Sequence, residues 1–170
     1  MAPAIVASTE NIDQKAMLAA GRVLAAAQGQ ISANMYKIAD VENLATKGLG
    51  VVLEQGIYAG LLFFYSKKKD TTPAQLMIGE LLKLSIDLVP ALNSVRIDAE
   101  PGGGLPGRGG DLVPALNSVR IDPNKSLDAL GYLAKTVCAD LRQTIWVKTV
   151  WEQTLTYVRY GAKALEKAGG

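Results

Sequence analysis

The residue types best suited to catalysis are scarce in this chain of 170 residues. The sequence contains no histidine and a single cysteine, Cys138. Without imidazole, neither a Ser-His-Asp triad nor a Cys-His dyad can form. One cysteine also excludes a thiolate zinc site and a disulfide framework within the chain. Catalysis would have to depend on carboxylates, lysine, tyrosine or a bound cofactor.

Two motifs that resemble reactive sites lack the structural context that such sites need. Gly102, Gly104 and Gly107 match the GxGxxG spacing of dinucleotide-binding loops, which requires a preceding strand and a following helix. Pro101 and Pro106 frame these glycines instead, so a linker is the better interpretation. Four aspartates are regularly spaced only because they begin and end the two copies of a repeated segment: Asp87, Asp98, Asp111 and Asp122. Their spacing therefore does not indicate a catalytic acid–base pair.

The positions of the basic residues are more informative about function than their number, because the formal net charge is only +2. Lys67, Lys68 and Lys69 close a predicted helix, where cations oppose the negative end of the helix dipole. Further basic residues follow one another along the last predicted helix: Arg142, Lys148, Arg159, Lys163 and Lys167. Such a series forms either a solvated helix face or a phosphate-binding surface.

The rest of the predicted fold is organised around residues 47–69, which read KGLGVVLEQGIYAGLLFFYSKKK. Their apolar residues recur at steps of three and four, which is helical spacing. We predict two short helices, roughly 42–55 and 57–67, that meet at Gln55-Gly56. The run without a charge from Gly56 to Tyr65 is far shorter than the about 20 residues that span a membrane. We therefore expect a core hairpin that is buried on most sides.

Helical patterns also cover the flanking segments, at roughly 12–28 and 32–40. Thr72-Pro73 is a helix start, and Pro90 predicts the end of that helix near Asp87. Two more helices are expected between Ser126 and Ala168. The apolar sides of these helices place several residues in the core: Leu127, Cys138, Leu141, Ile145, Trp146 and Trp151. The two tryptophans could instead stack on nucleic-acid bases.

One segment occurs twice. Residues 87–98 and residues 111–122 both read DLVPALNSVRID, and a Gly/Pro-rich spacer lies between them. Deleting 99–122 restores a compact sequence, and two copies are too few for a solenoid. We predict that 99–122 is an inserted surface loop that contains the duplicate, of native or cloning origin.

Composition favours an all-α protein. Hydrophobic residues make up 49% of the chain and aromatic residues 6%, and alanine and leucine dominate over β-branched clusters. We predict a single compact domain, residues 1–170, of about six or seven helices, the usual size for one hydrophobic core. The N-terminal sequence MAPAIVASTE has no basic region followed by an apolar one, so no signal peptide is expected and a cytoplasmic location fits.

The central stretch resembles the signature of the small subunit of type III-B CRISPR effector complexes, the Cmr complex. In that family a Leu-Pro element leads to an Asn/Gln-Gly-Leu turn and then to an Ala-x-Leu-x-Phe helix that ends in Ser-Lys. Here Gln55-Gly56-Ile57 supplies the turn, and Gly50 stands where proline is common. The matching helix and its end comprise Leu62, Phe63, Phe64, Ser66 and Lys67. The C-terminal TYVRYGAKALEKA is similar to the family's closing helix. The repeat region departs from the family pattern.

The resemblance implies an all-helical, cytoplasmic subunit without catalytic activity, cofactor or metal. It would pack beside the backbone and large subunits of the effector and beside other copies of itself, and it would contact the guide and target RNA through phosphates. Position selects the candidate RNA-binding residues: Arg22, Lys47, Lys67, Lys68, Arg142, Lys148, Arg159 and Lys163. Two other functions remain open at this point, a helical protein–protein adaptor with no nucleic-acid role and a small enzyme that uses carboxylates or a cofactor.

Overall fold

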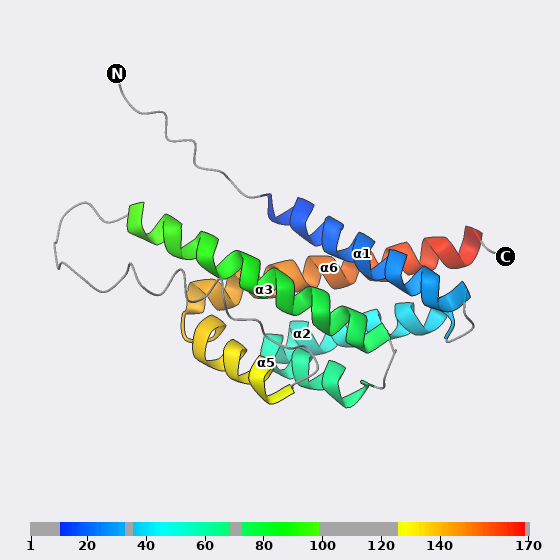
Figure 1. Ribbon diagram of the computed structural model, residues 1–170, viewed down its shortest axis with the longest axis horizontal. Helices are drawn as coiled ribbons and strands as arrows, with labels where there is room; N and C mark the ends of the chain where they lie inside the picture. The colour runs from blue at the N-terminus through cyan, green and yellow to red at the C-terminus, as the bar shows by residue number, and fades with distance from the viewer. Residues whose placement is uncertain (1–10, 33–35, 69–72, 99–125, 169–170) are drawn as a thin grey trace, which may run out of the picture.

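The computed structural model describes residues 11–32, 36–68, 73–98 and 126–168. These ranges hold five α-helices and one π-helical segment and no β-strand, which confirms the all-α prediction (Figure 1). The number of α-helices is below the six or seven predicted. The elements are α1 (Ile12–Ser32), α2 (Ile38–Ser66), α3 (Pro73–Asp98), α5 (Ser126–Tyr132), the π-helical η1 (Leu133–Val137) and α6 (Leu141–Ala168).

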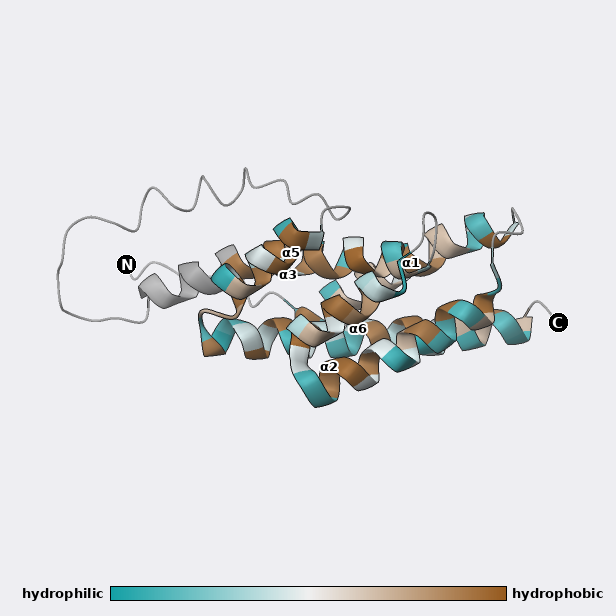
Figure 2. Cartoon of the chain, turned by 90° about the horizontal axis from the view of Figure 1, so that it is seen from below, coloured by the Kyte–Doolittle hydropathy of each residue, from teal (hydrophilic) through white to brown (hydrophobic). Residues whose placement is uncertain are grey.

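The long C-terminal helix α6 lies at the centre of the packing. It makes its most extensive contacts with α2 and α1, and α3 contacts α1, α2 and α6. In the view from below, α1 and α3 form one layer and α2 and α6 form the other (Figure 2). All of these helices contribute to one continuous cluster of buried apolar side chains.

Helix α2 is a hairpin whose two arms meet at Gly56. This residue has φ 87° and ψ −179°, a backbone conformation that is essentially restricted to glycine. The arms fold back on each other, because a Cβ at Gly60 would meet Val52 and a Cβ at Gly48 would overlap the Phe64 ring. The predicted helix break at Gly56 is therefore confirmed. The helix count falls partly because no loop separates the arms.

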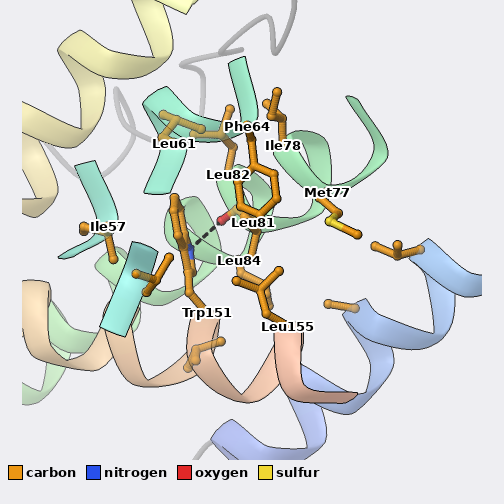
Figure 3. Close-up of a cluster of buried hydrophobic side chains, with 14 of the residues drawn as sticks. Ile57, Leu61, Phe64, Met77, Ile78, Leu81, Leu82, Leu84, Trp151 and Leu155 are labelled. Atoms are coloured by element: carbon orange, nitrogen blue, oxygen red, sulfur yellow. Dashed lines mark hydrogen bonds between the residues drawn. The ribbon is translucent and has the colours of Figure 1, made fainter. Parts of the chain in front are cut away.

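The core is densest where α2, α3 and α6 meet around Trp151. This tryptophan is fully buried, as are Phe64 and Leu61, and their side chains converge in Figure 3. The indole Nε1–H donates to the Leu81 carbonyl oxygen and to Ser85 Oγ, at 3.0 Å in each case. These bonds satisfy a polar group that would be costly to bury unpaired, so Trp151 belongs to the core and is not available to stack on bases.

The prediction that the hairpin is buried on most sides is wrong. Leu53 is 51% exposed, Tyr58 42% and Leu62 45%, because α3 and α6 cover only one side of α2. By length and composition α2 is the one helix, among the described residues, that could cross a membrane. That is weak evidence, since core helices pass the same test, and Val52, Ile57, Leu61 and Phe64 of α2 are buried in the core cluster.

Helix α3 continues past the end that the sequence predicts. It runs through Pro90 to Asp98 and does not stop near Asp87. Proline removes one helical hydrogen bond, yet Leu88 and Val89 just before it are buried. Burial of this turn against the rest of the core outweighs the local preference. The first copy of the repeated segment is thus the last part of α3, whereas the predicted loop 99–122 lies outside the described residues.

Between α5 and α6 the helical register shifts, and several core predictions fail there. The Cys138 N–H donates to the Leu133 carbonyl at 2.7 Å, an i→i+5 bond that adds a residue to the turn. A continuous period of 3.6 residues therefore no longer predicts which side faces inward. Cys138 is exposed. After the shift, the residues wrongly assigned to the core are Leu141, 75% exposed, Ile145, 53%, and Trp146, 39%. Leu127 lies on α5 before the shift and is also wrongly assigned, at 83% exposed.

Candidate nucleic-acid interface

The hairpin brings two of the predicted RNA-binding residues to one groove. Lys47 lies on the first arm of α2, and Lys67 directly follows the second arm. Both line a cavity of about 450 Å³ whose far wall is Pro73 and Ala74, at the start of α3. The positive end of the α3 dipole therefore adds to the two ammonium groups at this place. We call this cavity the hairpin groove.

The backbone of Lys67 is held at the end of α2, beside the groove. Its N–H donates to the carbonyls of Phe63 and Phe64, at 3.3 and 3.1 Å, and so closes the last turn of α2. Helix ends leave carbonyls without partners, and a lysine near them is also favoured by the dipole. Lys67 is therefore held at a defined end of the hairpin.

Aromatic and polar side chains complete the hairpin groove. Tyr36, Asn43 and Phe63 line it beside the two lysines. The Tyr36 hydroxyl oxygen is buried and has no hydrogen-bond partner among the described residues. Burial raises the pKa of the Tyr36 phenol above its ordinary value.

One acidic residue also faces the hairpin groove. Asp40 lines it, and its Oδ2 accepts a hydrogen bond of 2.9 Å from the Lys37 backbone N–H. The carboxylate thereby satisfies one of the free N–H groups at the start of α2. The formal charges of the described residues that line the groove, Lys47, Lys67 and Asp40, sum to +1, which still favours an anion.

The structure does not bring the remaining candidates on α6 together at one place. Arg159 lies over the Tyr160 ring, with its guanidinium carbon 5.5 Å from the ring centroid. Lys163 is exposed one turn further on. Arg142 lies near the start of α6, about 30 Å from Lys163 at 1.5 Å per residue. These three side chains can contact an extended polyanion only along the length of the helix.

Lys148 makes structural contacts that its position in the sequence did not predict. Its Nζ donates to the Leu53 carbonyl at 3.2 Å and lies 3.5 Å from Glu152 Oε1. The break at Gly56 leaves carbonyls at the end of the first α2 arm without helical donors. Lys148 satisfies one of them from α6, so its ammonium group helps to hold the hairpin.

Two other candidates are also engaged within the fold. Arg22 pairs with Glu80 of α3, with both Nε and Nη2 2.8 Å from Oε2. Lys68 lies over the Tyr65 ring, 5.7 Å from its centroid. An exposed ion pair such as Arg22–Glu80 contributes about 0–1 kcal/mol, and its charge is largely neutralised.

Sequence reasoning missed Tyr36, Asn43 and Phe63 as candidate binding residues. A signal was present, because positions 40, 43 and 47 follow helical spacing and so share one side of the first α2 arm. Tyr36 precedes that helix. The signal could not be recognised from the sequence alone. Phe63 and Lys67 come from the other arm, and only the fold at Gly56 brings that arm to the same groove.

A second hollow lies beside the start of α6. Leu141, Arg142, Ile145 and Trp146 line it together with Asp140. The three apolar side chains are exposed, so an apolar surface adjoins a basic residue here. We call this hollow the α6 start patch.

Nothing among the described residues has the composition of a metal site, since no group of three or more Cys, Asp or Glu side chains is close enough to hold an ion. Comparison with protein-family models, with curated proteins and with solved structures finds no match. The resemblance to the Cmr small subunit therefore rests on the sequence motifs alone.

Proposed function

We propose that this chain is a non-catalytic structural subunit of a CRISPR RNA-guided ribonucleoprotein effector in the cytoplasm. It packs beside the backbone and large subunits and beside other copies of itself, and it contacts guide and target RNA through phosphates. The observation that carries the RNA contact is the hairpin groove. There Lys47 and Lys67, 20 positions apart in sequence, line one cavity together with aromatic side chains.

The charge of a single copy predicts weak binding by the isolated chain. Its net charge of +2 gives little long-range attraction for RNA. Copies arranged along one RNA strand would sum their basic surfaces, and multivalency would raise the affinity of the array above that of any one copy. Arg142, Arg159 and Lys163 lie at different heights along α6 and suit such an extended arrangement.

The experiment compares the assembled effector with and without those three side chains. Replacing Arg142, Arg159 and Lys163 together by Ala should weaken retention of target RNA. It should also reduce the salt dependence of binding, by about 0.7 in slope for each phosphate that is no longer neutralised. Lys148 is left intact because it holds the hairpin. The position of RNA cleavage should not change, since the proposal assigns no cutting group to this chain. Unchanged affinity and slope in a normally assembled complex would contradict the α6 part of the proposal.

The exposed apolar residues favour a second candidate function, a protein–protein adaptor with no nucleic-acid role. The α6 start patch and the exposed α2 residues Leu53, Tyr58 and Leu62 are typical of surfaces that dock other proteins. A mobility-shift experiment with RNA, with and without the effector subunits, separates the two functions. An adaptor would join the protein assembly and leave the RNA affinity of the other subunits unchanged.

A further inference from the structure

The hairpin groove has the volume of a small-ligand subsite. Its volume of about 450 Å³ falls within the about 300–1,000 Å³ that is usual for ligand pockets. The groove is largely open to solvent, and its described lining combines apolar and aromatic residues with three charged side chains and one amide.

The charges in the groove select an anion of limited charge. Lys47 and Lys67 come from opposite arms, and among the described lining residues only Asp40 opposes them. The Asp40 carboxylate already accepts the Lys37 N–H. A single phosphate diester therefore finds two ammonium donors, and the start of α3 adds its dipole.

The aromatic side chains select a planar group beside that anion. Tyr36 and Phe63 both line the groove, and nucleic-acid bases stack on such side chains with little sequence preference. The exposed Asn43 amide also lines the groove and can bond to a polar edge of a base.

We propose that the hairpin groove binds one nucleotide of single-stranded RNA. Lys47 and Lys67 hold its phosphate, the base lies against the exposed parts of the Tyr36 and Phe63 rings, and the Asn43 amide bonds to its polar edge. This inference rests on the proposed RNA-binding function and adds a defined site and a strand type to it. A base paired in a duplex cannot enter, so the site takes an unpaired nucleotide.

The test measures fluorescence anisotropy of labelled six-nucleotide single-stranded RNA with the full-length chain. Replacing Lys47 and Lys67 together by Ala should weaken binding at least tenfold and lower the salt slope by about 1.4, at about 0.7 per phosphate. The matched control replaces two exposed lysines outside the groove, Lys83 and Lys135, and should change affinity less than twofold. A duplex of the same sequence and an abasic strand of the same length should both bind more weakly than the RNA.

Asn43→Ala separates the contact with the base from the contact with the phosphate. Asn43 is exposed, so its replacement should leave the melting temperature unchanged. RNA affinity should nevertheless fall at least threefold, with an unchanged salt slope because no phosphate contact is lost. Unchanged affinity would show that the amide does not bond to the base.

Four outcomes would overturn the inference. If the groove variants bind like the control variant, the groove is not a nucleotide site, and an effect confined to the α6 variants would leave the proposed function standing. If free adenosine monophosphate binds as tightly as the six-nucleotide strand, the site serves a free nucleotide and not RNA. If inorganic phosphate competes as well as the monophosphate, the base does not touch the groove. If neither the groove nor the α6 variants alter RNA binding by chain or complex, the proposed function falls as well.

Discussion

Adjacent residues in each arm of the α2 hairpin lie on two different sides. On the inner side the arms pack together, and the outer side lines the hairpin groove. Gly48 and Phe64 meet on the inner side, where Phe64 is fully buried. Their neighbours Lys47 and Phe63 line the groove on the outer side. The inner pair depends on close packing and tolerates no added atom. Lys47 and Phe63 instead border an open groove beside the lysine ammonium group, as a binding site for an anion requires. The same turn at Gly56 thus builds both a core contact and a candidate site.

The sharpest stability contrast should come from the two adjacent phenylalanines. Phe64→Ala empties a fully buried position and should lower the free energy of unfolding by about 3–5 kcal/mol. Phe63→Ala alters a half-buried residue of the groove and should cost about 1–2 kcal/mol, near the average for point mutants. Urea denaturation of both variants gives the two values. Equal costs would show that the two sides are not distinct.

Gly56→Ala should have the next largest effect on stability. Its φ of 87° and ψ of −179° are strained for any residue with a Cβ, and the cost should be about 1–3 kcal/mol. No side chain lies within 4 Å of the position that a Cβ would take, so the loss would report backbone conformation and not a clash. The measurement is the melting temperature. A stabilised variant would mean that the hairpin does not form in solution.

Two glycines of the same arm should respond in opposite directions to alanine. At Gly48 a Cβ would overlap Phe64, whereas at Gly50 it would meet nothing within 4 Å. Gly50→Ala should stabilise the protein by up to about 1 kcal/mol through helix propensity. Gly48→Ala should lose up to about 2 kcal/mol, since an overpacking cost of about 1–3 kcal/mol is offset by a propensity gain of up to about 1 kcal/mol. Chemical denaturation checks both signs, and a stabilised Gly48→Ala variant would contradict the close packing of the arms.

The smallest effect on stability is expected on the outer side. Replacing Lys47 and Lys67 by Ala should change the free energy of unfolding by less than about 0.5 kcal/mol per site, as is usual for surface substitutions. Their removal should appear in RNA affinity and in its salt dependence instead. A large fall in stability would assign the two lysines to the fold and weaken their assignment to binding.

Local chemistry explains which features the sequence could predict. The break at Gly56 and the helix start at Pro73 depend on backbone preferences of single residues, and both are where the sequence places them. The continuation of α3 through Pro90 and the register shift at Cys138 depend on burial and on an i→i+5 bond, which propensity does not encode. The groove depends on residues from two arms and from α3, so only Lys47 and Lys67 of its lining were predicted as binding residues.

The central claim is that this chain serves an RNA-guided effector. Its most direct test is to purify the full-length chain from its source cell and to identify the co-purified proteins by mass spectrometry and the co-purified RNA by sequencing. The account predicts backbone and large subunits of the effector together with guide RNA. Recovery of stable protein partners without any guide RNA would contradict it and would favour the adaptor function.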